Sequence, residues 1–477
     1  MSHIAVPWRR VLGLITVWLG LAALFAAAPA GAQRARVAIG PVAQCHGARC
    51  FVRLDVEGAT AQTAQVRVGP VTRRLRLAPG SSTRVVQVPR RALARPVRVT
   101  VGDVTARARV ERRAMPVNRA RSRCARLGAT DAYLSVGPPN DLDGAVNLSS
   151  IGTLRIAVLF VDFPGAAGQG DPRPANQAWM DAGIDVLERT SNGRFSVDIV
   201  ATTPGWTRMP ASARSYGFDD GITYDEHLVY LQDAIDAADA DVDFSDVDLP
   251  LVVVPDAANL FGSAAFRGLP GALVADEGVL GPAVTFGSDA EEVSGVIFEH
   301  ELLHTLGLAD LYAFFEPQQH EFVGLWDWMG SIFEPRTDLF VWNKTRLGWL
   351  RPNQTLCGAR RGSTSAVLAP SAGPRGTKSV FVRTGRFTGV TIEHRRPSDL
   401  DPGVCRSGVL VATLDSRVET GLGPIRVAGG RSDDRGCGTG PRSDATLRVG
   451  QSVRVDGATV RVVGRQGGRL EVVIDAG

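Results

Sequence analysis

Apolar and polar residues alternate in short runs over residues 33–118, and Gly and Pro separate the runs. The runs are CFVRLDV, AQVRVG, TRRLRLA, TRVVQVP, RPVRVTV and VTARARV. A period of two residues with regularly spaced turns predicts a small antiparallel β-sandwich, with its arginines mostly on the solvent-exposed faces. The polar, aperiodic stretch RAMPVNRARSRCARLG that follows indicates a linker.

Buried strands and amphipathic helices alternate in the middle of the chain. The apolar runs TLRIAVLFVDF, RFSVDIVAT, LPLVVVPD and GALVADEGVLGPAVTF predict strands. Helices are predicted for AWMDAGIDVLERTS, which Asn192 and Gly193 should end, and for ITYDEHLVYLQDAIDAADA. EEVSGVIFEHELLHTLG predicts a third helix, because it has an acidic start, an apolar face and Gly307 at its end. Residues 119–350 are therefore predicted to form one domain that mixes strands and helices, either α/β or α+β.

Residues 351–477 return to short alternating strands with Gly-rich turns, and SVRVDGATVRVVGRQGGRLEVVI contains a predicted hairpin. The predicted architecture is an α+β domain between an N-terminal β-sandwich and a C-terminal β-rich region. A chain of 477 residues is long enough for two or three such domains. With 44% hydrophobic and 21% charged residues, its composition excludes general disorder.

The N-terminus predicts export from the cytoplasm. Arg9 and Arg10 precede an apolar run over residues 11–28, and Ala-Gly-Ala at residues 30–32 offers a signal-peptidase site before Gln33. Residues 1–32 are therefore predicted to be a signal peptide, and the mature protein to be secreted or periplasmic. A retained membrane anchor is the alternative, because the run could just span a bilayer.

The chain has an even number of cysteines, which in an exported protein predicts three disulfides. Cys45 and Cys50 are the only obvious local pair. The six cysteines are Cys45, Cys50, Cys124, Cys357, Cys405 and Cys437.

The charge is unevenly distributed. Residues 33–123 contain 20 arginines and four acidic residues, a net charge of +16. The whole chain carries +4, of which +2 lies in residues 1–32, so residues 124–477 carry −14. This favours docking of the basic domain on the acidic remainder, or its contact with an anionic cell surface. Nucleic-acid binding is not expected, because the basic segment is strand-like, poor in aromatic residues and exported.

His300, Glu301 and His304 form an H-E-x-x-H pattern inside the third predicted helix. Residues four apart project from one helix face, so both imidazoles can reach one metal ion. Zinc suits nitrogen ligands, and it lowers the pKa of a bound water to about 7. Glu301 stands beside the first imidazole, where it could take the proton of that water and deliver it to a departing amine.

The residues after this pattern offer a third ligand. Gly307 lets the chain leave the helix sharply, and Asp310 lies three residues further on. This spacing matches an extended zincin motif with Asp310 in the third-ligand position. A solvent-exposed loop carboxylate is the alternative interpretation of Asp310, and His320 or Glu321 could also complete the site.

Other residues are secondary candidates. Four aspartates could hold Ca²⁺, although they lack EF-hand spacing and a solvated acidic turn is the simpler interpretation; they are Asp241, Asp243, Asp246 and Asp248. Tyr312 or Tyr224 could stabilise an oxyanion. His46 and His227 are expected on the surface. Four tryptophans are expected in the core beneath the site; they are Trp326, Trp328, Trp342 and Trp349.

The segment HELLHTLGLADLY is accompanied by further blocks in a fixed order between residues 153 and 417. They are IAVLFVDFPG, ERTSNGRFSVDIVATTPGWTRMPASARSYG, ADVDFSDVDLPLVVV, VGLWDWMGS, WNKTRLGWL and VTIEHRRPSDLDPGVCRSGVLVATLD. Together these segments resemble the immune inhibitor A family of secreted bacterial zinc metallopeptidases.

The resemblance implies a zincin-like domain that hydrolyses peptide bonds in protein or peptide substrates. It implies that His300, His304 and Asp310 bind zinc, that Glu301 is the general base, and that Met329 lies in a methionine turn beneath the site. An extended substrate is expected to pair with an edge strand in residues 271–287. The alternatives are a catalytically silent adhesin on the same scaffold and a zinc hydrolase that acts on an envelope component.

The sequence departs from the family pattern at three positions. Leu303 replaces a common Gly, Ala309 a common Pro, and His394 an expected Asn. None of these changes removes an essential group.

Overall fold

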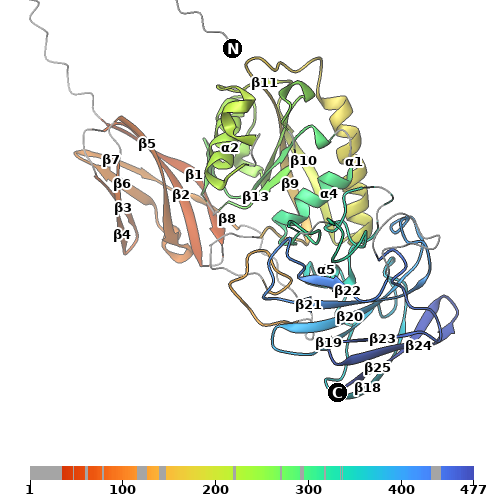
Figure 1. Cartoon of the computed structure of the whole chain (residues 1–477). Helices are drawn as coiled ribbons and strands as arrows, with labels where there is room; N and C mark the ends of the chain where they lie inside the picture. Colours follow the sequence, from red (N-terminus) through yellow and green to blue (C-terminus); the bar gives the residue numbers. More distant parts are fainter. Residues whose placement is uncertain are drawn as a thin grey trace, which may run out of the picture.

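The computed structural model describes most of the chain after residue 34. The described ranges are 35–46, 48–59, 63–77, 80–114, 126–138, 147–218, 222–260, 262–268, 271–290, 295–315, 318–333, 335, 337–430 and 442–477. The predicted signal peptide, residues 1–32, lies outside them. Within these ranges no helix is long and apolar enough to cross a membrane. The fold is mixed α/β, with many strands and few helices (Figure 1), as the sequence predicted.

The N-terminal region contains two four-stranded sheets, β5-β2-β1-β8 and β4-β3-β6-β7. The strands are β1 (Arg36–His46), β2 (Arg49–Ala59), β3 (Thr63–Val68), β4 (Val71–Arg76), β5 (Gly80–Pro89), β6 (Val97–Val101), β7 (Val104–Ala108) and β8 (Glu111–Ala114). In β3, exposed and buried residues alternate strictly. The buried side chains of both sheets form one hydrophobic cluster, so the sheets pack face to face. The predicted linker begins inside β8, and its residues 115–125 lie outside the described ranges.

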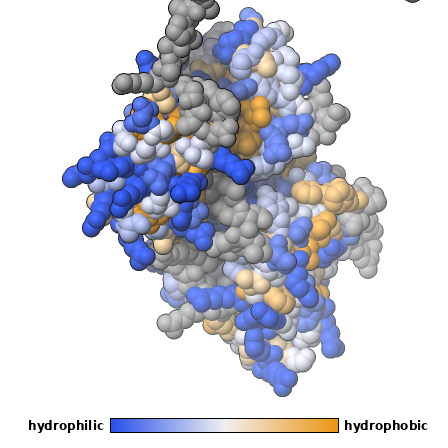
Figure 2. All heavy atoms as spheres, turned by 90° about the vertical axis from the view of Figure 1, so that its left-hand side faces the viewer, coloured by the Kyte–Doolittle hydropathy of each residue, from blue (hydrophilic) through white to orange (hydrophobic). Residues whose placement is uncertain are grey.

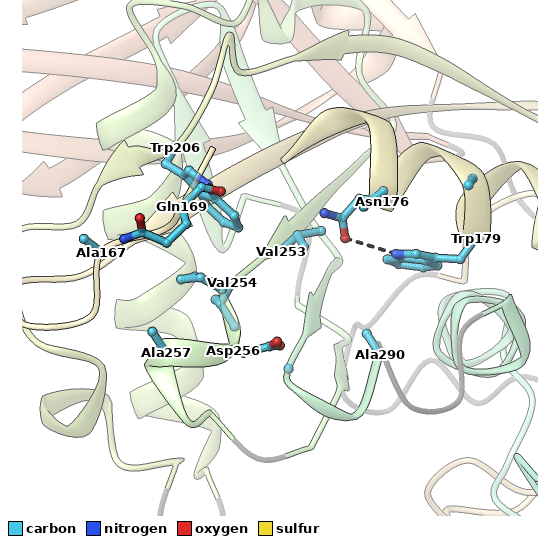
Figure 3. Close-up of a pocket in the computed structure, with 14 residues that line it drawn as sticks. Ala167, Gln169, Asn176, Trp179, Trp206, Val253, Val254, Asp256, Ala257 and Ala290 are labelled. Atoms are coloured by element: carbon cyan, nitrogen blue, oxygen red, sulfur yellow. Dashed lines mark hydrogen bonds between the residues drawn. The ribbon is translucent and has the colours of Figure 1, made fainter. Parts of the chain in front are cut away.

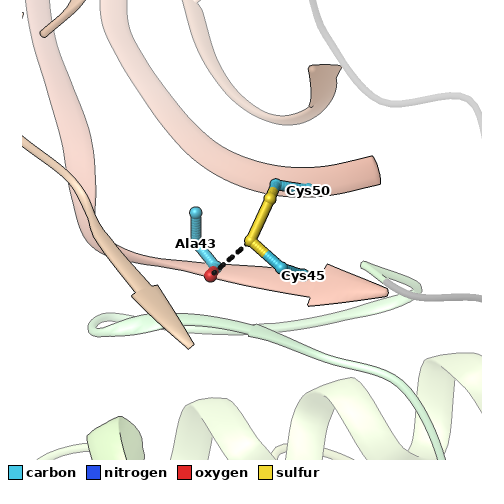
Figure 4. The surroundings of a disulfide bond; sticks show 3 residues. All are labelled: Ala43, Cys45 and Cys50. Carbon is cyan, nitrogen blue, oxygen red and sulfur yellow. Dashed lines mark hydrogen bonds between the residues drawn. A yellow bond between two sulfur atoms is a disulfide. The ribbon is translucent and has the colours of Figure 1, made fainter. Parts of the chain in front are cut away.

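The predicted pairing of Cys45 with Cys50 is confirmed (Figure 4). The two residues are directly opposite each other in the antiparallel pair β1–β2, with their Cα atoms 3.9 Å apart. Cys357 and Cys405 each take part in a disulfide as well. No described cysteine is free. The cysteines outside the described ranges are Cys124 and Cys437.

The central sheet has the order β10-β9-β12-β16-β13, and β11 also pairs with β9. Its strands are β9 (Gly152–Asp162), β10 (Phe195–Thr202), β11 (Thr207–Arg208), β12 (Leu249–Val253), β13 (Ala264–Phe266) and β16 (Ala283–Phe286). All neighbours are parallel except β13 and β16. The prediction of an edge strand within residues 271–287 is wrong. The strand β16 lies inside the sheet, and β14 (Leu273–Ala275) and β15 (Gly278–Leu280) form a separate hairpin, so the edge is β13.

Helices cover both faces of the central sheet (Figure 1). The α-helices are α1 (Arg173–Thr190), α2 (Tyr224–Ala238), α4 (Gly295–Thr305) and α5 (Val341–Arg346), and the short 3₁₀ turns are η1 (Arg90–Ala94), η2 (Ala213–Tyr216), η4 (Phe244–Asp246) and η5 (Asp256–Ala258). Leu154 and Ile156 of β9 share a hydrophobic cluster with α1 and α4, whereas Ala157 and Leu159 share another with α2. A strand buried on both faces explains the continuous apolar run in β9.

Two more sheets make up the C-terminal region, β17-β19-β20-β21-β22 and β18-β25-β24-β23. Their strands are β17 (Thr355–Cys357), β18 (Gly362–Leu368), β19 (Ser379–Arg383), β20 (Thr388–Arg395), β21 (Gly408–Asp415), β22 (Ile425–Val427), β23 (Ser452–Val455), β24 (Ala458–Gln466) and β25 (Arg469–Ala476). The predicted terminal hairpin is present as β23–β24–β25. Val380 packs toward the second sheet, while its neighbour Phe381 joins the cluster that contains α4. The five-stranded sheet therefore shares a core with the central region, across the predicted boundary at residue 350.

The N-terminal sandwich contacts the central region through its first sheet. Strands β1 and β2 lie against β15, and the backbone N–H of Val42 donates to the carbonyl of Glu277 at 3.3 Å. Arg53 on β2 pairs with Asp276 at 3.4 Å. The second sheet, β4-β3-β6-β7, lies on the outer side of the molecule (Figure 1).

Candidate metal centre

Helix α4 carries the H-E-x-x-H residues into the core. His300, Glu301 and His304 are all buried, with 3%, 5% and 7% of their surface exposed. The helix packs closely on α1 because Gly183 has no side chain. A Cβ atom added at Gly183 would lie 2.7 Å from a ring carbon of Phe298, which is too close for any other residue. This close packing fixes the position of the helix that carries the candidate ligands.

Three ligand atoms converge at one point. His300 Nε2 lies 3.1 Å from His304 Nε2, and each of these nitrogens lies 3.1 Å from Asp310 Oδ1. Two donors bound to one tetrahedral zinc at its usual bond lengths lie roughly 3.3 Å apart. The three atoms are therefore spaced as the ligands of a single small cation. The sequence prediction that Asp310 joins the two histidines agrees with this geometry.

Backbone carbonyls set the proton positions on both imidazoles. His300 Nδ1 donates to the carbonyl of Trp328 and His304 Nδ1 to the carbonyl of Leu308, each at 2.9 Å. A carbonyl oxygen can only accept, so each Nδ1 carries the proton and each Nε2 presents a lone pair when the ring is neutral. Two lone pairs and a carboxylate oxygen then face one another at 3.1 Å, an arrangement that requires a proton or a cation between them.

The electrostatics of the site favour positive charge. Burial opposes protonation of His304, but the Asp310 and Glu301 carboxylates outweigh it and raise the pKa of this imidazole to about 9. Burial also opposes ionisation of Asp310, yet the two imidazoles hold the pKa of its carboxyl below the usual range. Burial raises the pKa of Glu301. The donor set of two imidazoles and a carboxylate, with Glu301 beside it, suits a divalent cation such as zinc.

A buried aspartate supports the loop beneath His300. Asp327 has φ of 79° and is fully buried. Its Oδ1 accepts from the N–H of Met329 at 2.9 Å, and its Oδ2 accepts from the N–H of Phe340 and from Asn343 Nδ2 at 2.6 and 2.9 Å. These bonds hold the Trp328 carbonyl where His300 needs it. Met329 is fully buried in the same turn and has a structural place beneath the site.

The C-terminal region reaches the third ligand. The Thr420 hydroxyl, in the loop between β21 and β22, donates to Asp310 Oδ2 at 3.0 Å and accepts from the Asp310 N–H at 2.8 Å. The N–H of Gly421 donates to the carbonyl of Asp310 at 3.1 Å. Thr420 was not singled out in the sequence, because it lies 110 residues from Asp310 and in no motif that carries chemistry.

A buried network of charges joins the central and C-terminal regions. The Arg395 guanidinium donates to Asp401 at 2.7 and 2.8 Å and to Glu393 at 3.0 Å, and Lys344 of α5 pairs with Asp338. Burial raises the pKa of Glu393 to about 7, although Arg395 opposes this shift. These residues belong to the segments WNKTRLGWL and VTIEHRRPSDLDPGVCRSGVLVATLD and to the loop before α5. They anchor that loop rather than line the metal centre.

The other candidate ligands do not reach the centre. His320 Nδ1 donates to the carbonyl of Gly330 at 3.2 Å, and Glu321 pairs with Arg442 at 3.4 Å. Among the described residues, His300, His304 and Asp310 are the one group of three or more that could hold a metal ion.

The candidate calcium residues make separate contacts. Asp243 accepts from the N–H of Ser245 at 2.8 Å, Asp246 pairs with Arg155, and Asp248 accepts from the N–H of Arg155 at 3.0 Å. Nothing in this arrangement supports the calcium alternative, which also included Asp241, over the solvated acidic turn that the sequence favoured.

The secondary candidates have mixed outcomes. The ring of Tyr312 stacks on His300 with centroids 6.3 Å apart, so it borders the centre. Tyr224 instead packs on Phe266 of the edge strand. The expectation that His227 is a surface residue is wrong, because it is 5% exposed and its Nε2 bonds the Thr285 hydroxyl at 2.9 Å. The expected core tryptophans are all buried; they are Trp326, Trp328, Trp342 and Trp349.

The departures from the family pattern fit the structure. Leu303 and Ala309 are buried apolar residues in the core around α4. His394 is buried too, and its ring bonds the Leu368 carbonyl and the Ser407 hydroxyl at 3.3 and 3.0 Å. Burial lowers the pKa of His394 to about 4, so this ring stays neutral.

A cavity of about 500 Å³ opens at the carboxyl ends of the parallel strands (Figure 3). The indole rings of Trp206 and Trp179 lie on opposite sides of it, and Val253 and Val254 form its floor. Trp179 also contacts Phe298 of α4, with ring centroids 6.0 Å apart. None of the metal-centre residues lines the cavity. Neither tryptophan was predicted to have a role.

Comparison with known proteins adds no family assignment. No protein family and no curated protein matches the chain. One similar solved structure is a GH20 exo-β-N-acetylglucosaminidase from Vibrio harveyi in complex with N-acetylglucosamine. It shares 9% identity and a TM-score of 0.12, and the match covers 60% of this chain and 38% of that chain. This likeness is too weak to support a statement about fold or function.

Proposed function

We propose that this chain is a secreted, zinc-dependent endopeptidase similar to the immune inhibitor A family, with a zincin-like catalytic region. The observation that carries the proposal is the convergence of His300, His304 and Asp310, at 3.1 Å spacing, beside the buried carboxylate of Glu301. The disulfide between Cys45 and Cys50 supports export, because disulfides persist in oxidising compartments.

The arrangement of the sheet around α4 supports the zincin-like assignment. The helix lies against one face of a mainly parallel sheet whose last strand, β13, runs antiparallel. Among the described strands, β13 pairs only with β16, and it contacts α4. An extended peptide could add to this edge by backbone hydrogen bonding and pass beside the metal centre. This geometry favours a protein or peptide as the substrate.

Each residue at the centre then has a distinct role. Zinc, when bound, would supply Lewis acidity at this position. The two histidines and Asp310 would hold the ion, and the carbonyls of Trp328 and Leu308 keep the imidazoles in the binding tautomer. Glu301 accepts a proton from the attacking water and returns it to the amine that leaves. Burial raises the pKa of Glu301, which improves it as a base.

The test is the variant Glu301→Gln, compared with Glu321→Gln as a matched control. Both changes replace a glutamate by its amide, but Glu321 lies outside the metal centre and pairs with Arg442. We expect Glu301→Gln to retain zinc and to cleave casein at least about 100-fold more slowly, since a general base contributes about 10²–10⁴-fold. The control should retain both zinc and activity.

Casein cleavage by Glu301→Gln at the wild-type rate would refute the base assignment. A wild-type protein that binds zinc but cleaves no protein substrate would favour the alternatives, a silent adhesin or a hydrolase of an envelope component.

A further inference from the structure

The outer sheet of the N-terminal sandwich presents a face rich in arginine. Strand register places Arg67 on β3 opposite Arg98 on β6, and Arg98 opposite Arg107 on β7. Neighbouring strands lie about 4.8 Å apart, so these three residues form a row roughly 10 Å long. Arg74 and Arg76 on β4 belong to the same face, because they stand opposite Gln65 and Thr63 of β3. We call these five residues the arginine face; they are Arg67, Arg74, Arg76, Arg98 and Arg107.

The arginine face has no counter-charge within the described part of the chain. All five arginines are exposed, and none of them pairs with a described carboxylate. The sequences of β3, β4, β6 and β7 contain no acidic residue. Like charges directly opposite each other destabilise a sheet, and a 10 Å row is about one screening length at physiological salt. The fold alone does not require this row, so an anionic partner is its simplest explanation.

Among the described residues, the arginine face belongs to the sheet that lies away from the central region. The sandwich contacts the central region through β1 and β2 of its other sheet. Figure 2 shows the side on which the outer sheet lies, where hydrophilic residues gather densely over the N-terminal region. A large ligand could therefore reach this face from solvent.

The chemistry of the arginine face selects among polyanions. Its remaining side chains include Gln65 and the hydroxyls of Thr100 and Thr105, which lie 3.1 Å apart. No large hydrophobic side chain is exposed in the described part of the sandwich, so it offers no anchor for a bilayer. The face has no aromatic residue on which bases could stack, and no helix that could enter a groove. Guanidinium groups among hydroxyls and an amide suit a hydrated, hydroxyl-rich polymer with carboxylate or sulfate groups.

We propose that the outer face of β4-β3-β6-β7 is a binding site for an acidic polysaccharide. Binding would hold the enzyme at an anionic extracellular or cell-wall matrix, independently of the metal centre. The interaction is electrostatic, so it weakens as salt rises.

The experiment compares two triple variants of the full chain for binding to immobilised heparin at several salt concentrations. Arg67→Gln/Arg98→Gln/Arg107→Gln removes the central row. The matched control carries three substitutions of exposed arginines on the other sheet; they are Arg36→Gln, Arg49→Gln and Arg112→Gln. Both variants lose the same net charge from the same sandwich. Neutral dextran, duplex DNA and phosphatidylserine vesicles serve as alternative ligands.

We expect the central-row variant to bind heparin about tenfold more weakly at 0.15 M salt, with a shallower salt dependence, whereas the control stays close to wild type. The melting temperature of the central-row variant should equal or exceed that of wild type, because like-charge repulsion between the arginines is relieved. Equal weakening in both variants would show that only net charge matters and would overturn the proposal. Tighter binding to DNA or vesicles than to heparin would overturn it as well. Binding to heparin and melting temperature do not depend on peptidase activity, so a negative result in this experiment would leave the proposed function intact.

Discussion

Thr420→Val tests whether the C-terminal region helps to build the metal centre. The substitution keeps the size and β-branching of the side chain but removes its hydroxyl. That hydroxyl makes two bonds to Asp310, one to Oδ2 at 3.0 Å and one from the N–H at 2.8 Å. Both are lost in the variant, while the bond from the Gly421 N–H to the Asp310 carbonyl remains.

The expected effect is a loss of zinc affinity. Removing a residue that orients a metal ligand typically weakens binding 10–100-fold, which corresponds to about 1.4–2.8 kcal/mol. The Asp310 N–H also loses its partner, which should lower the free energy of unfolding of the metal-free protein by about 1–3 kcal/mol. Asp310 is 8% exposed, so water can replace the lost bonds only in part.

The assay is competition for zinc between the protein and a fluorescent chelator. Thr420→Ser is the control, since it keeps the hydroxyl and should bind zinc close to the wild-type affinity. Urea unfolding of the metal-free variants separates loss of the site from loss of the fold. Wild-type zinc affinity in Thr420→Val would refute the idea that this threonine positions Asp310.

Two further predictions concern stability. Asp327→Asn should lower the free energy of unfolding by about 1–3 kcal/mol, because an amide cannot accept from the N–H groups of Met329 and Phe340 and from Asn343 at once. Burial raises the pKa of Asp327 to about 6, so the folded state binds this proton more tightly than the unfolded state does. The stabilisation from the protonated carboxyl should therefore fall as pH rises through about 6. Urea titrations of the variant at several pH values should lack that slope. Cys45→Ala/Cys50→Ala should destabilise the N-terminal sandwich by roughly 2 kcal/mol, the loop entropy released by opening a six-residue ring, as measured by chemical denaturation; an unchanged midpoint would contradict this.

Short sequence patterns predicted where helices end and how the chain turns after them. Asn192 and Gly193 have φ of 57° and 69°, and helix α1 ends just before them, as the sequence indicated. The spacing of His300 and His304 on one helix face, with Gly307 at φ of 97°, predicted how Asp310 approaches them.

Features that depend on tertiary pairing could not be predicted. The apolar runs in residues 271–287 indicate strands without indicating their partners, which explains why the predicted edge strand is wrong. In the structure β16 inserts between β12 and β13, and only a parallel pairing with β12 reveals this. His227 has an ordinary helical context, and its burial follows from packing against Phe218 and Phe266, where it bonds Thr285 across 58 residues. Thr420 likewise acquires its place through a contact between distant segments.

Zinc content is the most direct test of the metal centre. The full-length protein is incubated with zinc, dialysed and analysed for bound metal, alongside His300→Ala/His304→Ala. The converging ligands predict about one zinc per wild-type chain and none in the double variant. A wild-type protein that retains no zinc, or a double variant that retains as much as wild type, would contradict the metal centre and the peptidase function proposed from it.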